Sequence, residues 1–510
     1  MYARILTASL NGLDCEKVWS EANVENGLMS FSIVGLANQA IKESKERVRA
    51  AISNCGYDFP DTRITVNLTP AGMKKDGSHF DLAIALAVLL SSGEIAQGRE
   101  LEDIAFLGEL SLDGKINPVI GILPMVIGLR EIGVKKIVLP KRNIKEASLV
   151  KDLELMAVDN ILEVMEYVCG LNDIVAYKSN VKDEMPAYLI EDFADIKGQE
   201  IVKRAAQIAA AGFHGMLMVG PPGVGKSMVG KRIPSIMPPL SYDQQLEVTQ
   251  IYSVAGLLDE NRPIITERPF RSPHHSITAP AMVGGGSILR PGEVSLAHHG
   301  VLFLDELPEF HSGVIDTLRQ PLESGNVTIS RVNGTIKYPA KFMIIAAMNP
   351  CRCGYYGDPN HRCVCTETDR QKYAGKVSGP LLDRIDLHIL VNRPNYEELH
   401  SNVPSINSLT MREAVITATQ VQEERYKKLD ISYNSQLTPS LIKEFCPLDN
   451  ESQTLLEQAF TKWNMSARSY HRIIKISRTI ADMEGSKQIK TEHLLEALSY
   501  RMPERYLSNE

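Results

Sequence analysis

The chain has 510 residues, of which 44% are apolar and 23% are charged, and this composition is typical of a soluble, folded protein of several domains. A formal net charge of −7 excludes a protein with a uniformly basic surface, so any contact with nucleic acid would be confined to a local groove or pore. Because no apolar run is long enough to span a bilayer and the N-terminus lacks the pattern of a secretion signal, we expect a cytoplasmic protein that does not contact a membrane.

The N-terminal part of the chain alternates between short apolar strands and helices. Helical spacing is clearest at 39–52 and 81–90. We therefore predict an α+β domain over residues 1–175. The polar and acidic stretch that follows, at 176–191, is typical of a linker. The predicted strands of the domain are 3–9, 30–34, 64–68 and 136–139.

The next part, residues 192–395, alternates continuous apolar runs with helical segments. Such runs are typical of buried parallel strands that helices cover on both faces, so we predict an α/β domain. After Arg393 and Pro394 only helical periodicity remains, which predicts a C-terminal helical lid over 396–510. The predicted strands are 216–219, 301–304 and 342–347, and the predicted lid helices are 441–445, 452–463, 469–483 and 491–500.

A glycine-rich loop follows the strand predicted at 216–219 and precedes a helical segment, which is the context of a P-loop. Its glycines let backbone N–H groups turn toward a β-phosphate, its lysine places a positive charge at the β and γ oxygens, and its serine hydroxyl can ligate Mg²⁺. The loop therefore predicts ATP and Mg²⁺ as cofactors. Its residues are Gly220, Pro221, Pro222, Gly223, Val224, Gly225, Lys226 and Ser227.

Two carboxylates follow the apolar run 301–304 directly. Asp305 and Glu306 thus lie where the carboxyl end of a buried parallel strand opens onto a ligand crevice. We assign Asp305 to Mg²⁺, held directly or through water, and Glu306 to the general base that polarises the attacking water.

Two further residues complete the predicted chemistry. Asn349 ends another buried run and can reach the γ-phosphate or the attacking water, although it could instead be a turn residue before Pro350. Arg384 precedes a last predicted strand at 388–391. There it could neutralise transition-state charge on the ATP of a neighbouring subunit, or it could form only a local ion pair.

Four of the eight cysteines form two Cys-x-Cys pairs around a polar loop: Cys351, Cys353, Cys363 and Cys365. Four thiolates can close a tetrahedral Zn²⁺ site, and such a site is structural because it leaves no open position for water. We therefore expect zinc to hold the loop together with little direct effect on the nucleotide chemistry. Free thiols or a redox pair are the alternatives, and His361 could replace one sulfur.

These motifs resemble those of AAA+ ATPases, and with the segment 292–300 before Asp305 the chain resembles the Mg-chelatase-like AAA+ family of YifB and ComM. The resemblance covers essentially the whole chain. It implies that residues 195–199 lie near the adenine and that Arg468, at the start of a lid helix, is the sensor 2 arginine. It also implies a helix-2 insert within 270–286, and a homo-oligomeric ring, expected to be a hexamer.

The same resemblance places a hairpin, over 327–339, in the pore of such a ring. Its two arms alternate around Asn333 and Gly334, a strong short hairpin signal, and carry Arg331 and Lys337. Basic residues there would concentrate positive potential where a phosphate backbone passes, in spite of the net charge of −7. The alternative is that they are ordinary solvated loop charges.

The N-terminal domain resembles the C-terminal domain of Lon protease and the related domain of RadA, with landmarks at 75–77 and 133–141. However, His79 occupies the position of the nucleophile and Leu123 that of the lysine. Peptide hydrolysis needs a serine that a nearby base activates. Ser78 would restore the serine if the alignment slipped by one residue, but not the base, so we expect a Lon-like domain without proteolytic activity.

The resemblance as a whole implies an Mg²⁺-dependent AAA+ ATPase that acts as a DNA motor. Its work would be helicase activity and branch migration on recombination intermediates in natural transformation, with single-stranded or branched DNA as partner. The alternative is a chaperone motor that remodels a protein partner, as Mg-chelatase subunits do. An inactive scaffold is a third reading, against which the intact motifs argue.

Overall fold

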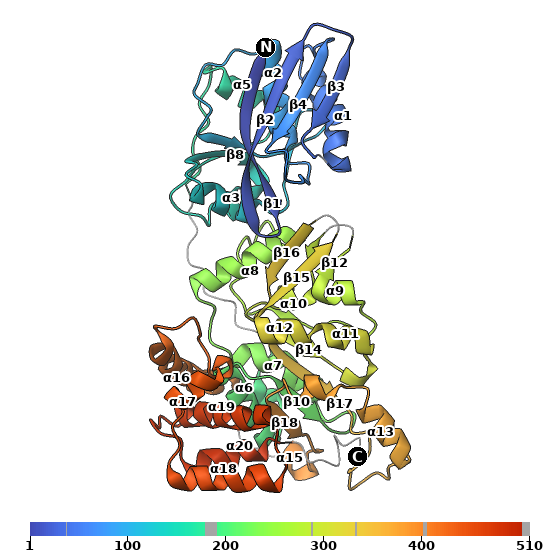
Figure 1. Cartoon of the computed structure of the whole chain (residues 1–510), viewed down its shortest axis with the longest axis vertical. Helices are drawn as coiled ribbons and strands as arrows, with labels where there is room; N and C mark the ends of the chain where they lie inside the picture. The colour runs from blue at the N-terminus through green and yellow to red at the C-terminus, as the bar shows by residue number, and fades with distance from the viewer. Residues whose placement is uncertain (37, 179–190, 287–288, 332–333, 401–404, 502–510) are drawn as a thin grey trace.

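The structure is a computed structural model that describes residues 1–36, 38–178, 191–286, 289–331, 334–400 and 405–501. It has a mixed N-terminal sheet, a central parallel sheet and a C-terminal helical region, as the sequence predicts (Figure 1). The predicted linker at 176–191 lies mostly outside the described residues. Within the described ranges, every helix is too short or too polar to cross a bilayer.

A seven-stranded sheet forms the N-terminal part, in the order β3-β4-β2-β1-β5-β8-β9. Successive side chains of β1 pack on opposite faces: Ile5 lies with α1, α2 and α5, and Leu6 lies with α3 and α4. The elements are β1 (Tyr2–Asn11), β2 (Asp14–Glu25), β3 (Ser30–Val34), α1 (Gln39–Asn54), β4 (Arg63–Thr69), α2 (Asp81–Ser92), β5 (Ile104–Phe106), β6 (Glu109–Leu110), β7 (Ile116–Asn117), α3 (Ile122–Glu131), β8 (Lys136–Pro140), α4 (Ile144–Ala147), β9 (Glu154–Val158) and α5 (Ile161–Val168).

Five parallel strands form the central sheet, in the order β11-β14-β17-β10-β18. Along β10, Met216 and Met218 pack into the core on one face, whereas Leu217 and Val219 pack into the core on the other, so both faces are covered. The sheet elements and the helices between them are α6 (Glu200–Gly212), β10 (Met216–Val219), α7 (Lys226–Ile236), α8 (Tyr242–Ala255), β11 (Phe270–Arg271), β14 (Val301–Leu304), β17 (Met343–Met348) and β18 (Leu387–Leu390).

The segment predicted as a helix-2 insert, within 270–286, begins after Arg271. Phe270 and Arg271 pair in parallel with β14, so they belong to the edge of the sheet. Smaller elements follow along the chain: α9 (Ala279–Val283), β12 (Gly284–Gly285), β13 (Arg290–Pro291), α10 (Glu293–Leu296), α11 (Ser312–Thr317), α12 (Arg319–Ser324), β15 (Asn326–Arg331), β16 (Gly334–Pro339), α13 (Glu367–Ala374) and α14 (Gly379–Leu382), with 3₁₀ turns at Lys141–Asn143, Phe193–Asp195, Leu307–Glu309 and Asn434–Gln436.

The N-terminal part rests on α8 and on the β15-β16 hairpin. The Tyr242 hydroxyl donates to the Leu149 carbonyl at 2.7 Å, and α3 packs along α8. The turn between β1 and β2 reaches the hairpin, where a side chain at Gly12 would collide with Ile336 of β16. The N-terminal part therefore contacts the hairpin along β16, so the hairpin does not stand free.

The C-terminal helical region packs against α6 and α7, where α16 and α19 complete the core of that face of the sheet. A buried polar network joins it to the loops that precede β10 and β18. His214 bonds to Asp386 through Nδ1 and to Thr479 of α19 through Nε2, both at 2.8 Å. The helices are α15 (Tyr396–His400), α16 (Ser408–Tyr426), α17 (Pro439–Phe445), α18 (Asn450–Lys462), α19 (Ala467–Met483) and α20 (Thr491–Ser499).

Asp482 is the centre of that network, and its removal should destabilise the protein strongly. The buried carboxylate accepts hydrogen bonds from Arg425 at 2.8 Å, Asn434 at 2.9 Å and Arg478 at 3.1 Å. Asp482→Ala leaves the buried Arg478 guanidinium without its counter-charge, so we expect a loss of about 3–5 kcal/mol in the free energy of unfolding. Denaturant titration measures it, and Asp430→Ala, at an exposed carboxylate, should change it by less than about 0.5 kcal/mol. Equal losses in the two variants would contradict the role of the network.

Candidate functional site

The P-loop connects the end of β10 to the start of α7. Gly223 and Gly225 have φ of 79° and 89°, a left-handed backbone that a side chain would strain. Lys226 is the first residue of α7, so the loop ends on a helix N-terminus, which attracts phosphate. The structure thus has the strand, loop and helix that the motif requires.

Lys226 and Asn349 meet at the carboxyl ends of two neighbouring strands. The lysine Nζ donates to the Gly220 carbonyl at 2.7 Å, to the Pro221 carbonyl at 2.8 Å and to Asn349 Oδ1 at 3.1 Å. Burial lowers the pKa of Lys226 to about 8, and the carboxylates of Asp305 and Glu306 oppose that shift. A phosphate oxygen beside Nζ would restore the charged form in the same way.

Ser227, the residue after the lysine, contacts the first of the two carboxylates. The Ser227 hydroxyl donates to Asp305 Oδ2 at 2.6 Å, so two hard oxygen ligands converge at one point. Mg²⁺ prefers such oxygens, and these two residues therefore fit the ion. The backbone N–H of Glu306 donates to Asp305 Oδ1 at 3.0 Å. Glu306 has a positive φ of 52°.

His275 is a neighbour of Glu306 that no sequence signal identified as part of the site. Its Nδ1 lies 3.9 Å from Glu306 Oε2, and the ring packs against His274. The Glu306 side chain is 58% exposed, so solvent reaches the proposed base.

A cavity of about 590 Å³ lies beside the P-loop and is large enough for a nucleotide base and ribose. Gly198 and Gln199 line it, as the resemblance implied, and the Gln199 side chain donates to the Asn392 carbonyl at 2.7 Å. Asp195 does not line the cavity; its carboxylate pairs with Arg232 at 2.9 Å. Of the segment 195–199, Gly198 and Gln199 thus line the cavity, whereas Asp195 does not, and a place near the adenine stays a prediction.

The cysteine loop supplies another wall of this cavity. Its residues Tyr356 to Asn360 line the cavity, and a side chain at Gly354 would approach Pro222 of the P-loop to 2.7 Å. The buried side chain of Asp358 lies 3.2 Å from Arg393 in the loop after β18. The loop thus lines the same cavity as the P-loop residues Gly220 and Pro221.

The four cysteine sulfurs lie together within 4.8 Å of one another. Cys351 Sγ is 3.3 Å from Cys353 Sγ and 3.8 Å from Cys363 Sγ, and the Cys353 and Cys363 sulfurs are 3.6 Å apart. Sulfurs that ligate one Zn²⁺ tetrahedrally at about 2.3 Å lie about 3.8 Å apart, whereas a disulfide needs about 2 Å. The spacing fits a four-sulfur zinc site that includes Cys365. His361 instead faces Asp358, at 3.5 Å.

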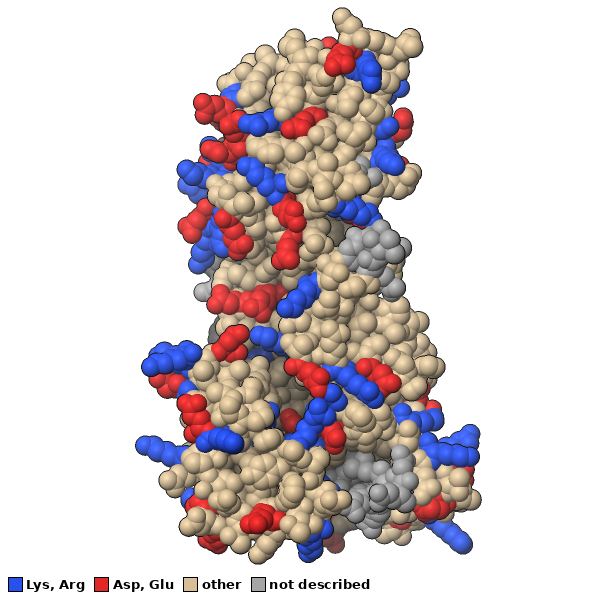
Figure 2. Space-filling model, in the orientation of Figure 1, with Lys and Arg blue, Asp and Glu red and all other residues tan. Residues whose placement is uncertain are grey.

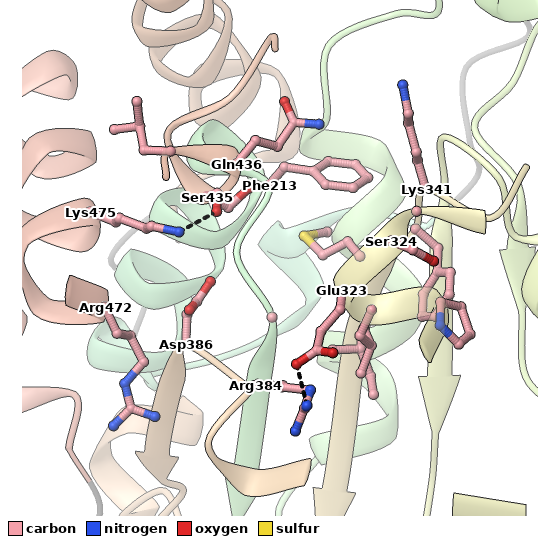
Figure 3. A pocket seen from close by; sticks show the side chains of 18 of the residues that line it. Phe213, Glu323, Ser324, Lys341, Arg384, Asp386, Ser435, Gln436, Arg472 and Lys475 are labelled. Carbon is pink, nitrogen blue, oxygen red and sulfur yellow. Dashed lines mark hydrogen bonds and ion pairs between the residues drawn. The ribbon is translucent and has the colours of Figure 1, made fainter. Parts of the chain in front are cut away.

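Arg384 and Arg468 meet at the opposite end of the sheet from the P-loop. Both line a cavity of about 520 Å³, whose lining also includes Gly215 before β10, Phe342 before β17 and Asp386 before β18. Figure 3 shows Arg384 in this cavity, against Glu323. Arg384 forms an ion pair with Glu323 of α12, and Arg468, at the start of α19, reaches the same Glu323 oxygen at 3.3 Å. Arg472 instead donates to the Ile385 carbonyl at 3.0 Å.

Arg384 and Arg468 lie far from the P-loop of the same chain. The four residues of β18 span about 13 Å, and Arg384 lies before the strand whereas the nucleotide cavity lies beyond it. A fully extended arginine is shorter than that. Within one chain, the structure brings together Lys226, Ser227, Asp305, Glu306 and Asn349, and it leaves Arg384 and Arg468 apart from them.

The histidine pair in the segment before β14 forms a second cluster, with Glu247 of α8. His298 and His299 both bond to Glu247 Oε2 through Nε2, at 3.0 and 2.8 Å. The backbone N–H of Lys341 donates to His298 Nδ1 at 3.0 Å, so the proton of the neutral ring is on Nε2 and that atom cannot ligate a metal. Burial lowers the pKa of His298 to about 4. The cluster anchors α8 to the strand that carries Asp305.

The positions that correspond to the Lon catalytic pair do not form one. His79 is buried, its Nε2 contacts the Ala8 carbonyl at 2.9 Å, and burial lowers its pKa to about 4. Ser78 donates to Glu109, and Leu123 is buried in α3. Among the described side chains at these positions, we therefore find no serine that a lysine or histidine activates.

Three family models match the chain in order along its length. They are Subunit ChlI of Mg-chelatase over residues 20–143, Magnesium chelatase, subunit ChlI over 192–399, and Magnesium chelatase, subunit ChlI C-terminal over 405–501. The second model covers the P-loop, the carboxylates and the cysteine loop, and the third covers most of the C-terminal helical region.

Full-length relatives are similar over almost the whole chain. The competence protein ComM of Haemophilus influenzae is 40% identical over 502 residues, which cover 97% of this chain and 96% of that protein. The uncharacterized protein YifB of Escherichia coli is 38% identical over 502 residues, covering 98% and 97%. A Lon protease of Citrifermentans bemidjiense is 31% identical over 171 residues, which cover 30% of this chain and 20% of that protein. With P-loop, carboxylates and parallel sheet in place, the chain belongs to the magnesium chelatase ChlI family of AAA+ ATPases, as a homologue of ComM and YifB.

Proposed function

We propose that the chain is an Mg²⁺-dependent ATPase whose active sites form between neighbouring copies in a ring, and that the ring moves DNA. Lys226 binds the β- and γ-phosphates, and Ser227 with Asp305 holds Mg²⁺, which neutralises phosphate charge when bound. Glu306 orients the attacking water and accepts its proton, while Asn349 positions that water against the γ-phosphate.

The observation that carries the ring is the position of the two arginines. Arg384 and Arg468 share one cavity at the amino ends of the strands, whereas the P-loop lies at the carboxyl ends. An arginine that stabilises the transition state must touch the γ-phosphate. Because neither can do so in its own chain, we assign both to the ATP of a neighbouring copy. A cyclic arrangement, expected to be a hexamer, gives every site this pair.

The hairpin supports DNA as the substrate of the motor. Its two strands pair in register, with Arg331 opposite Gly334, as predicted; Asn333 and the Arg331 side chain lie outside the described residues. Val327, Ile329 and Tyr338 are buried on one face, and Lys337 is exposed on the other. An exposed polar face with a lysine suits a phosphate backbone without any reading of bases.

Charge and relatedness support the same substrate. On the face shown in Figure 2, the described Lys and Arg side chains are interspersed with Asp and Glu, as the net charge of −7 requires. A local contact in a pore fits this surface better than binding over a broad basic face. The name of the Haemophilus influenzae relative, a competence protein, supports a role in natural transformation, such as helicase activity and branch migration on recombination intermediates.

DNA should stimulate ATP hydrolysis, and loss of Lys337 should weaken DNA binding. For Arg331→Ala/Lys337→Ala we expect a weaker affinity and a shallower salt dependence, by about 0.7 units of slope for each lost phosphate contact on single strands and about 0.9 on duplex. Anisotropy titrations of a labelled fork across salt concentrations measure this. Lys462→Ala, which removes an exposed lysine of α18, is the matched control. An ATPase rate that neither single-stranded nor forked DNA raises would favour the remodelling of a protein partner instead.

We also propose that Cys351, Cys353, Cys363 and Cys365 hold a structural zinc ion. The support is the spacing of their sulfurs and their place in a loop that is too polar to form a core of its own. The ion would fix the loop that forms a wall of the nucleotide cavity.

Protein purified without added metal should contain about one zinc per chain, by elemental analysis. Because the loop lines the cavity, Cys351→Ser/Cys363→Ser should lose the metal and bind ADP several-fold more weakly, as measured with a fluorescent ADP. Cys169→Ser, which removes a thiol of the N-terminal part, should keep both zinc and affinity. Metal-free wild-type protein that binds ADP normally would refute the site.

A further inference from the structure

One carboxylate connects three separate elements at the cavity of the two arginines. Glu323 Oε1 contacts Arg384, from the loop before β18, as Figure 3 shows. The same oxygen contacts Arg468, from the N-terminus of α19. Glu323 itself comes from α12. A single negative charge thus lies against two positive ones, and the cluster keeps an excess positive charge that attracts phosphate.

Glu323 is also the last acidic residue before the hairpin. Gly325, in the left-handed region with φ of 65°, turns the chain from α12 directly into β15. The Gly325 carbonyl accepts from the Ala340 N–H at 2.8 Å, which closes the base of the hairpin, and the Ser324 hydroxyl donates to the Asn326 carbonyl at 2.9 Å. A displacement of the hairpin therefore moves Glu323 with it, because only a closed turn separates them.

The ion pair between Glu323 and Arg468 is weak enough to be exchanged. These two side chains are 53% and 52% exposed, so water screens their attraction, whereas the Arg384 side chain is 14% exposed and meets water mainly through its partner Glu323. An exposed ion pair of this kind favours the paired state over the separated side chains by a factor of about five at most. A γ-phosphate carries more charge than a carboxylate and offers more acceptor oxygens, so it can displace Glu323 from both guanidinium groups.

We propose that Glu323 is a latch: it occupies Arg384 and Arg468 until the ATP of a neighbouring copy competes for them, and movement of the hairpin on DNA releases it. Glu323 is then a positioning residue that couples the contact between the hairpin and DNA to ATP hydrolysis. It acts through the two arginines and does not touch the reacting atoms. The proposal rests on the proposed action of both arginines on a neighbour's ATP.

Glu323→Gln tests the latch because it removes the charge but keeps the shape and one hydrogen-bonding oxygen. In full-length rings without DNA, we expect ATPγS to bind about two- to fivefold more tightly than to wild type, and the DNA-free ATPase rate to rise by a similar factor. The affinity for ADP should be unchanged, because ADP has no γ-phosphate to compete for the arginines. DNA should tighten ATPγS binding to wild type and do so less in the variant.

Two controls separate a latch from a structural effect. Asp316→Asn removes an exposed ion pair to Arg319, at the start of α12. It should change neither the affinity for ADP nor the affinity for ATPγS. A general disturbance of the fold would shift the ADP and ATPγS affinities together. Equal shifts in both, no shift in either, or weaker ATPγS binding alone would overturn the latch.

The outcomes also distinguish the latch from the proposed function on which it rests. If Arg384→Ala keeps wild-type ATPγS affinity and turnover, the assignment of the arginines to a neighbour has failed, whatever Glu323→Gln does. If DNA changes neither rate nor affinity in wild type but Glu323→Gln still discriminates ATPγS from ADP, the latch stands and its coupling to DNA has failed.

Discussion

Glu306→Gln chains should bind ATP as wild type does and hydrolyse it about 10²- to 10⁴-fold more slowly, because the amide cannot accept the proton of the attacking water. The change is nearly isosteric, and the Glu306 backbone, which bonds to Asp305 Oδ1, keeps its conformation. Steady-state ATPase and the equilibrium affinity for ATP separate the two effects. The variant should accumulate as ATP-bound rings.

Lys226→Ala is the informative contrast to this variant. Lys226 Nζ lies among the P-loop carbonyls and Asn349, so its loss should weaken binding itself rather than turnover alone. Glu309→Gln, at an exposed carboxylate near Glu306 that pairs with Lys376, is a matched control and should leave the rate unchanged. Wild-type turnover in Glu306→Gln would exclude this residue as the base.

Much of the nucleotide site could be predicted because its signals are local in sequence. A strand, a glycine loop and a helix follow one another from Met216 to Ile236, so the spacing alone determines where Lys226 lies. Asp305 and Asn349 each end an apolar run, and the carboxyl ends of parallel strands meet at one edge of a sheet. The site of the reaction follows from these contiguous patterns.

Contacts between distant segments could not be predicted in this way. Glu323 is 61 residues from Arg384 and 145 from Arg468, and nothing in its own sequence context marks it. The cysteine loop could be recognised as a metal site from its spacing, but its position against Pro222 depends on the fold of the whole sheet. Such pairings are properties of the tertiary structure.

Among the elements of the N-terminal part that the sequence did not predict, β2 and α3 escaped for physical reasons. β2 buries Val18, Ser20 and Ala22 beneath a charged opposite face, so its apolar content is too low to signal a strand. α3 contains Pro124 near its start, a position where the missing N–H has no partner to lose. In β2 the contrast between apolar and polar positions is weak, and in α3 the proline resembles a helix breaker. Tertiary packing stabilises both elements, so neither could be predicted from its own sequence.

Arg384→Ala should bind ATP at most a few-fold more weakly than wild type and lose about 10³-fold or more of its hydrolysis rate, since the residue stabilises transition-state charge far more than it stabilises the bound nucleotide. A neighbour's role can be tested by mixing. A ring of Arg384→Ala and Lys226→Ala chains contains interfaces at which an intact arginine faces an intact P-loop. We therefore expect mixed rings to recover part of the wild-type rate, although each variant alone is inactive.

The recovered activity should follow the number of mixed interfaces. In a random ring of equal parts, about one interface in four combines the intact P-loop of one variant with the intact arginine of the other, and this fraction falls as either variant dominates. An Asp316→Asn chain with intact site residues controls for assembly. If verified mixed rings recover nothing, Arg384 acts within its own chain or not at all. Since the whole of β18 separates it from the P-loop, the geometry favours recovery.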